Sequence, residues 1–351
     1  MTDNAPGTAA SSHPMTDAEL DILLSTTRDR LEKGLRRTIN AQQRLSDALQ
    51  ESAPVRPGRE HPRHARHPVS TIRPGDHAWL AFSGEPERDR VIGAFVRDGL
   101  DMNEKMVYIA DDEARQLLGV LPRHGYDLPA LMRGGQLSFI PREEACMDSR
   151  GRFDAGRMLQ TLAQQVDEAF DQGFRAVRMT TDLTWALSEP GRPTLNQMLG
   201  CEHRLGENVF STSMTMAICQ VDRRCCSKED LAALGDSHEI VVEANPEFDD
   251  GILRIVRTFE PPGLRLEGEI DVARQAILKE LLKTTTSDDP THLDISRLGF
   301  IDLGGLNVLA QHARQLPKHA PLVLDNVPRQ ILAVIEMVGW QHQPGFVLGR
   351  T

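Results

Sequence analysis

The chain has 351 residues, of which 40% are hydrophobic and 26% are charged, and its formal net charge is −11. This length suggests about two domains, and the apolar content is sufficient to fill their cores. An acidic chain argues against non-specific nucleic-acid binding, which needs a basic face. No stretch approaches the roughly 18 consecutive apolar residues of a membrane span, and residues 1–14 lack the apolar core of a signal peptide.

The cysteines are odd in number and form no Cys-x-x-Cys pair. They are Cys146, Cys201, Cys219, Cys225 and Cys226. A disulfide framework and a structural zinc site are therefore not expected, and no metal site is assigned. Together with the charge and the missing apolar segments, this predicts a cytoplasmic protein with no nucleic-acid and no membrane partner.

The N-terminal region divides into three parts. Residues 1–15 are small and polar, so disorder is expected. Residues 16–51 are predicted to form an amphipathic helix, because their leucines fall on one stripe at about 100° per residue. Two interpretations stay open for this helix, which can pack on its own domain or join two chains in a homodimer. Residues 52–69 hold four prolines and are predicted to be a linker, whose evenly spaced His61, His64 and His67 are not expected to bind metal.

Residues 70–245 alternate between strand-like and helix-like segments, which is typical of a layered α/β domain with parallel strands. Strands are expected within 74–82 and at 105–110, 137–140, 175–180, 215–220 and 239–243. Helices are expected at 91–100, 154–172, 195–205 and 228–234, and residues 83–90 are expected to form a polar loop.

Residues 252–351 are predicted to form a second, smaller α/β domain. The expected order is two strands in a hairpin (253–259 and 264–270), a helix (273–283), a strand (292–295), a helix (305–316), a strand (321–324) and a helix (329–338). About 100 residues are enough for one small domain of this kind.

Three motifs recur in order in this second domain. Leu266-Glu267-Gly268-Glu269-Ile270-Asp271 resembles Leu-x-Gly-x-Leu-Asp, Asp294-Ile295-Ser296 resembles Asp-Leu-Ser, and Asp302-Leu303-Gly304-Gly305-Leu306 resembles Asp-Ser-Ser/Thr-Gly-Leu. The second domain thus resembles the STAS domain, the fold of anti-sigma factor antagonists. In that family the second hydroxyl residue of the last motif accepts a phosphate from a partner kinase, and here that position is Gly304.

The STAS resemblance implies a docking role without the usual phosphorylation switch. It implies as partner an anti-sigma factor of the histidine-kinase-like ATPase type. The candidate docking residues are Asp302, Leu303, Gly304, Gly305, Leu306 and Asn307. A phosphate at this helix start would add about two negative charges where the partner approaches. Neither Leu303 nor Gly304 has a hydroxyl that could carry such a phosphate. Ser296 is close in sequence and is expected to hydrogen-bond locally.

The first domain resembles the MEDS domain, a sensory domain of regulators in methylotrophs, methanogens and actinobacteria. The resemblance spans roughly residues 68–245. It rests on the segments 75–77, 99–100, 107–109, 173–180, 185–187 and 217–224. The family usually has Gly-Glu-Met-Ser-Trp where this chain has Thr181-Asp182-Leu183-Thr184-Trp185, so the acid is one carbon shorter. Because the family is distantly similar to RecA-type ATPases, the resemblance implies a RecA-like parallel sheet.

Nucleotide hydrolysis is not expected in the first domain. The loop after its first strand, 83–90, has one glycine, no lysine and two glutamates, so it lacks a phosphate-binding loop. Ligands favour the carboxyl ends of parallel strands, so a small-molecule site is predicted there. Its candidate residues are His77, Trp79, Glu85, Arg88, Asp112, Asp182 and Trp185.

The sequence therefore predicts a regulator in which a small ligand or signal in the first domain controls docking by the second. The cofactor is unknown, and no catalytic residues can be assigned. Two alternatives stay open, namely a degenerate nucleotide-binding enzyme of RecA-like descent and a ligand-free scaffold of a stress-signalling assembly. A missing phosphate-loop lysine disfavours the first, and a cleft lined by Asp182 and His77 would disfavour the second.

Overall fold

The structure is a computed structural model, and it describes residues 66–110, 124–188, 193–206, 209, 214–285 and 288–349. The predicted disordered start (1–15), the amphipathic helix (16–51) and nearly all of the linker (52–69) lie outside the described residues, as does Asp112. The last predicted linker residues are described, and Arg66–Pro68 forms a strand, β1, which pairs with a later strand of the first domain.

The first domain contains a seven-stranded sheet in the order β1-β7-β2-β6-β5-β3-β4, in which all neighbouring strands run parallel. The further strands are β2 (His77–Phe82), β3 (Lys105–Ala110), β4 (Leu137–Pro141), β5 (Val177–Asp182), β6 (Thr215–Asp222) and β7 (Ile240–Glu243). Every residue of β6 is buried, as expected for a central parallel strand covered on both faces.

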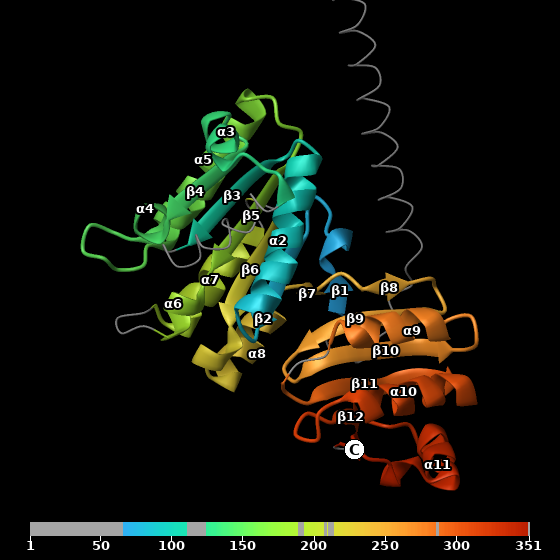
Figure 1. Ribbon diagram of the computed structural model, residues 1–351. Coiled ribbons are helices and arrows are strands. Elements are labelled where there is room, and N and C mark those ends of the chain that lie inside the picture. The colour runs from blue at the N-terminus through green and yellow to red at the C-terminus, as the bar shows by residue number, and fades with distance from the viewer. Residues whose placement is uncertain are drawn as a thin grey trace, which may run out of the picture. The chain divides into compact units, whose positions relative to one another are not determined.

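Helices cover both faces of this sheet (Figure 1). One face packs against α2 (Glu85–Asp101) and α3 (Leu128–Arg133), and its core includes Phe95 and Tyr108. The other face packs against α4 (Arg142–Cys146), α5 (Ala155–Asp171), α6 (Thr184–Ser188), α7 (Leu195–Leu205) and α8 (Lys228–Asp236). Two apolar layers around one sheet give the predicted α/β layered class.

The predicted polar loop at 83–90 is wrong, because α2 begins at Glu85. Gly84 occupies the N-cap position, Pro86 stands in the first turn, and both are common at helix starts. The Glu87 carboxylate also accepts hydrogen bonds from the Ser83 N–H and hydroxyl. Polar composition therefore signalled a helix start here and not a loop.

The second domain contains a six-stranded mixed sheet in the order β13-β12-β11-β10-β9-β8. Its strands are β8 (Phe248–Asp249), β9 (Leu253–Phe259), β10 (Pro262–Ile270), β11 (Thr291–Ile301), β12 (Leu322–Asp325) and β13 (Phe346–Leu348). The predicted hairpin is present, since β9 and β10 pair antiparallel, while β10 to β13 pair parallel.

Three helices pack against one face of this second sheet and share its apolar core (Figure 1). They are α9 (Gln275–Lys283), α10 (Leu303–Gln315) and α11 (Arg329–Val338). Strand β11 runs six residues beyond the predicted end at Ile295, because Leu298 and Ile301 still pack into the core across two register irregularities with β10. Helix α10 likewise starts at Leu303, two residues before the predicted Gly305.

Candidate functional site

The start of α10 is organised by the carboxylate of Asp302. Its Oδ1 accepts a hydrogen bond of 2.6 Å from the N–H of Gly305, which is a standard N-cap. The Gln275 side-chain amide donates to both Asp302 oxygens at 3.0 Å, so α9 and α10 are joined at this point. The acid of the third sequence motif therefore serves as a helix cap that is held from both sides.

The two glycines after Asp302 have different surroundings. A Cβ on Gly304 would lie 2.2 Å from Nε2 of Gln275, the end of a flexible side chain. A Cβ on Gly305 would lie 2.8 Å from both Ile270 and Ile301, inside the core. The position of the family's phosphate acceptor is therefore occupied by the Gln275 amide, and Gly305 permits the close approach of α10 to the sheet.

Exposed apolar residues lie beside this helix start. Val272 is 78% exposed and Leu303 is 62% exposed. Ile270 and Ile301 pair across the parallel strands β10 and β11, and Val272 and Leu303 lie two residues after them. Asn307 is also exposed and lies one helical turn after Leu303. We call Val272, Leu303 and Asn307 the docking patch.

The predicted docking residues fall into two groups. Leu303 and Asn307 are exposed, and Asp302 and Gly304 are half-buried. Gly305 and Leu306 are buried, with Leu306 only 1% exposed. Direct contact with a partner is thus available to Leu303 and Asn307, while Gly305 and Leu306 fix the position of the helix.

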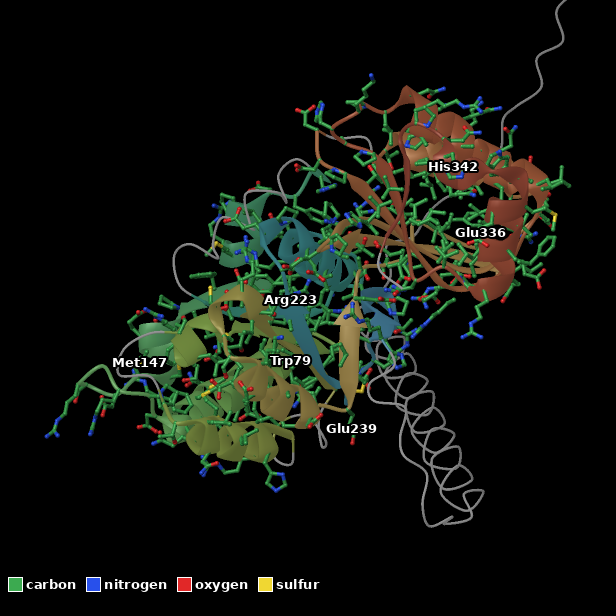
Figure 2. The ribbon with its side chains drawn as sticks, turned by 90° about the horizontal axis from the view of Figure 1, so that it is seen from below. Trp79, Met147, Arg223, Glu239, Glu336 and His342 are labelled. Carbon is green, nitrogen blue, oxygen red and sulfur yellow. The ribbon has the colours of Figure 1, made fainter. Side chains whose placement is uncertain are left out.

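In the first domain, one of the predicted ligand residues, Trp79, lines a cavity, whereas His77, Arg88, Asp182 and Trp185 do not line it. Trp79, on β2, is 3% exposed and lines a cavity of about 620 Å³ together with Glu87 and Arg223. Figure 2 labels Trp79 and Arg223 in the first domain. Glu85 is exposed at the first turn of α2 and does not line this cavity.

Arg88 is buried and paired locally. Its guanidinium donates to Oδ1 of Asp89 at 2.9 and 3.0 Å. Burial disfavours the guanidinium charge, yet the hydrogen bonds and attraction of Asp89 outweigh it and hold the Arg88 pKa above its ordinary value.

Asp182 and Trp185 lie at the end of β5 and in the helix after it. The Asp182 carboxylate accepts a hydrogen bond of 2.9 Å from the N–H of Thr184, which satisfies a backbone donor at the start of α6. Trp185 is 6% exposed and packs in the core beside Phe153. Both residues thus have structural contacts, and their contact with a ligand remains a prediction.

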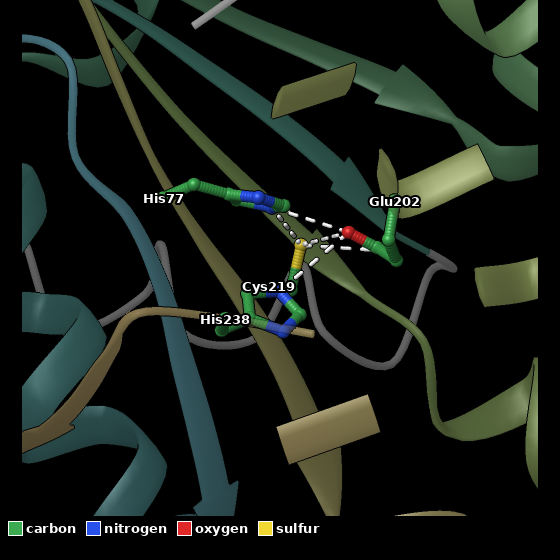
Figure 3. A group of neighbouring side chains, drawn as sticks. All are labelled: His77, Glu202, Cys219 and His238. Carbon is green, nitrogen blue, oxygen red and sulfur yellow. Dashed lines mark hydrogen bonds and ion pairs between the residues drawn. The ribbon is translucent and has the colours of Figure 1, made fainter. Parts of the chain in front are cut away.

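His77 belongs to a buried polar cluster that the sequence did not predict (Figure 3). The other members are Glu202 on α7, Cys219 on β6 and His238 between α8 and β7. His77 Nε2 lies 3.1 Å from Glu202 Oε2 and 3.2 Å from Cys219 Sγ. His238 Nε2 lies 3.5 Å from the same Glu202 oxygen. We call these four residues the His77 cluster.

Burial and mutual charge perturb the cluster. Desolvation raises the pKa of the Glu202 carboxyl, but the hydrogen bond from His77 and the attraction of both imidazoles outweigh it, so that pKa lies below its ordinary value. Burial, followed by the charge of Glu202, raises the pKa of the Cys219 thiol well above its ordinary value. Glu202 thus holds its charge inside the domain only because imidazoles surround it.

Sequence reasoning found one member of this cluster because the four residues share no local motif. They come from two strands, a helix and a connection, and 161 positions separate His77 from His238. The pairing of β2 with β6 could have indicated part of the cluster. It places His77 beside Ala217, which is two residues before Cys219.

The loop that would bind phosphate in an ATPase is occupied by the protein's own side chains. A Cβ on Gly84 would lie 3.3 Å from the Arg224 guanidinium, and the Glu87 carboxylate caps the Ser83 N–H. The first turn of α2 carries Glu85 and Glu87, whose charges oppose an anion at this helix start. The absence of phosphate binding at this loop remains a prediction.

Comparison with protein families identifies both domains. Residues 76–239 match the family model of MEDS, the methanogen/methylotroph DcmR sensory domain, and residues 253–349 match that of the Mlab STAS domain. The predicted order of a MEDS domain followed by a STAS domain is confirmed, as is the α/β fold class of both. A sensory domain joined to a STAS domain makes the chain a signalling regulator, and neither match is to an enzyme family.

Comparison with solved structures gives more distant similarities. An anti-sigma factor antagonist from Mycobacterium paratuberculosis is 20% identical, with a TM-score of 0.23, and the match covers 29% of this chain and 82% of that one. A KaiC-like protein from Pyrococcus horikoshii OT3 is 14% identical, with a TM-score of 0.36, over 52% of this chain and 78% of that one. No curated protein sequence matches the chain. Among the described residues, no helix has the length and apolarity to cross a membrane.

Proposed function

We propose that this chain is an anti-sigma factor antagonist-like regulator whose STAS domain docks onto an anti-sigma factor through the docking patch. The observation that carries the proposal is the pair of exposed apolar residues Val272 and Leu303 at the capped start of α10. Val272 and Leu303 follow the carboxyl ends of the central strands β10 and β11, and a partner that covers them would remove apolar surface from water. The match of residues 253–349 to a STAS family model supports a docking role for this patch.

Phosphorylation at the family's usual position is proposed not to switch docking off in this chain. Gly304 has no hydroxyl, and the Gln275 amide fills the space where a side chain would begin. Leu303 has no hydroxyl either. Control of docking must then come from elsewhere in the chain, and the MEDS domain is the proposed source.

The proposed input is a small ligand of the MEDS domain. The 620 Å³ cavity beside Trp79 has the size of a small-molecule site and is bordered by the charged groups of Glu87 and Arg223. A ligand controls docking only to the extent that it binds more tightly to the chain arrangement in which the docking patch is available. The proposed partner is an anti-sigma factor of the histidine-kinase-like ATPase type.

The direct test is capture of the partner from the native cell by the tagged full-length chain, with identification by mass spectrometry. The wild-type chain should capture a kinase-like ATPase, and Leu303→Glu should lower its recovery at least tenfold because a charge replaces the apolar contact. A glutamate in the first turn of α10 favours the helix dipole, so the fold should be retained.

A matched control is available on α11. Met337 is 84% exposed and apolar, so Met337→Glu makes the same chemical change on the same domain away from the docking patch. Recovery should be unaffected by Met337→Glu. Equal losses from both variants, or capture of a protein that is not a kinase-like ATPase, would refute the proposal.

The nucleotide-binding alternative has its own test. Equilibrium titration of the full-length chain with ATP and magnesium should give no specific binding at micromolar concentration, because Glu87 and Arg224 occupy the loop after β2. Tight binding that Asp182→Ala abolishes would favour the degenerate enzyme over the regulator.

A further inference from the structure

The His77 cluster concentrates more ligating groups than an ion pair needs. One histidine would be enough to balance the buried Glu202 carboxylate. Instead, two imidazoles and a thiol approach the same carboxylate, and the four donor atoms lie within 4.8 Å of one another. The side chains of Glu202 and His238 are fully buried, and that of His77 is 11% exposed.

The distances within the cluster match those between the ligands of a tetrahedral zinc ion. Bond lengths of about 2.0 Å to nitrogen or oxygen and about 2.3 Å to sulfur place neighbouring ligand atoms roughly 3.3–3.8 Å apart. The Glu202 Oε2 atom lies 3.1 Å from His77 Nε2, 3.5 Å from His238 Nε2 and 3.6 Å from Cys219 Sγ. All four ligand atoms lie within 4.8 Å of one another, so an ion would draw the more widely spaced ligands closer together by side-chain movements of up to about 1 Å.

The surroundings of His238 orient it as a ligand. Its Nδ1 lies 2.8 Å from the carbonyl oxygen of Leu234, which fixes the proton on Nδ1 and directs Nε2 to the cluster. Metal-binding histidines usually make this second hydrogen bond to a carbonyl or carboxylate. Trp79 packs beside the His238 ring, with 5.1 Å between ring centroids, and restricts access of water to it.

We propose that His77, Glu202, Cys219 and His238 form a closed tetrahedral site for a divalent transition ion, with Zn²⁺ as the ion that fits best. Two imidazoles, one thiolate and one carboxylate are all zinc ligands. The two negative ligands neutralise the ion, so the filled site carries no net charge into the core. When the ion binds, the Cys219 thiol loses its proton to solvent, and His77 keeps a proton only on Nδ1, so that its Nε2, which now donates to Glu202, is free to bind the ion.

Four protein ligands leave no open position on the ion, which is typical of structural and not of catalytic zinc. The ion would join β2 and β6 to α7 and to the segment after α8, which are distant in sequence. Metal binding is therefore expected to stabilise the packing of α7 and α8 on the MEDS sheet.

The test uses the purified full-length chain. Elemental analysis should find one zinc per chain, and a chelator should lower the melting temperature, which added Zn²⁺ should restore. Replacement by Co²⁺ should give the visible absorption of a tetrahedral, thiolate-bound ion. Loss of one ligand should weaken Zn²⁺ affinity by more than about 100-fold, since loss of an outer-shell partner alone costs 10–100-fold.

Two variants and one control separate this site from other metal-binding groups. Glu202→Gln and Cys219→Ser keep the size of each side chain but remove a ligand. Cys201→Ser is the control, because Cys201 is also fully buried on α7 and its sulfur faces Met158. Circular dichroism of the metal-free variants should be native, and Cys201→Ser should bind Zn²⁺ as the wild type does.

The proposal has clear contrary outcomes. A full-length chain that binds no Zn²⁺ in titration would leave the His77 cluster as a buried ion pair. Binding that survives both Glu202→Gln and Cys219→Ser would place the ion elsewhere, for example at His61, His64 and His67. Equal weakening by Cys201→Ser would show that the substitutions act through packing.

Discussion

The His77 cluster places polar groups in the protein interior, and the docking patch places apolar groups on the surface. Both depart from the usual distribution of side chains. The MEDS domain buries two histidines, a glutamate and a cysteine together, whereas the STAS domain exposes Val272 and Leu303. Burying charge costs folding free energy unless every charge is matched, and exposing an apolar side chain costs little stability. Substitutions in the cluster should therefore change stability, and substitutions in the patch should change binding.

The largest effect on stability is expected from Glu202→Ala. It leaves His77 and His238 without their carboxylate inside the core, and breaking a buried charge pair in this way costs about 3–5 kcal/mol. Urea unfolding followed by tryptophan fluorescence would measure the loss. Glu229→Ala is the control, because Glu229 is exposed on α8 and its replacement should cost less than about 0.5 kcal/mol. Equal stability of the two variants would contradict the role of Glu202.

The next largest effect is expected from Gly268→Ala in the first STAS motif. Gly268 has φ +97°, and a Cβ there would lie 1.9 Å from the carbonyl oxygen of Ile252. Backbone strain and steric overlap together should lower the free energy of unfolding by about 3 kcal/mol.

Gly251→Ala separates the two causes. Gly251 also has a positive φ of +81°, but nothing lies within 4 Å of its Cβ position. Only strain remains, so its cost should be about 1 kcal/mol by thermal unfolding. A Gly251→Ala loss as large as that of Gly268→Ala would mean that the carbonyl of Ile252 is not the cause.

A smaller effect is expected at the family's phosphate position. Gly304→Ser should cost about 1 kcal/mol, because its Cβ displaces the Gln275 amide from Asp302. With the partner kinase and ATP, the wild-type peptide 301–306 should gain no phosphate, whereas Gly304→Ser supplies a hydroxyl for it. Phosphate on the exposed Ser296 of the wild type would instead reveal a displaced switch.

The smallest effect is expected from pH. Burial lowers the pKa of His312 in α10 below its ordinary value of 6.5, and His312 Nε2 has no hydrogen bond among the described residues. A base with a lowered folded-state pKa contributes stability that is complete above pH 6.5 and is lost as the pH falls below it. His312→Asn should therefore flatten the fall in melting temperature between neutral and mildly acidic pH, relative to wild type. Parallel curves would contradict this.

Much of the fold could be predicted from the sequence because its signals are local. Helix α7 (Leu195–Leu205) and helix α11 (Arg329–Val338) have the predicted bounds, since apolar periodicity and flanking proline or glycine define them. The start of α2 was missed because its glutamates indicate both a solvated loop and a helix N-terminus. The extension of β11 was missed because Leu298 is buried after two exposed residues, which breaks the alternation of a strand.

The two sites also differ in whether their residues are close together in the sequence. The docking residues around Asp302 form one contiguous motif, so the sequence was sufficient to identify the region, but not to separate the exposed Leu303 from the buried Leu306. The His77 cluster comes together only when β2 and β6 pair and α7 and α8 pack against them. Neither periodicity nor spacing in the chain records such contacts.

The most direct test of the central claim is release of a sigma factor from its complex with the captured anti-sigma factor. Wild-type chain and Met337→Glu should release the sigma factor at the same concentration, while Leu303→Glu should need at least tenfold more protein. Measurement by size-exclusion chromatography gives the released fraction directly. If Leu303→Glu releases the sigma factor as well as the wild type does, or the wild type releases none, the chain does not act as an anti-sigma factor antagonist through this patch.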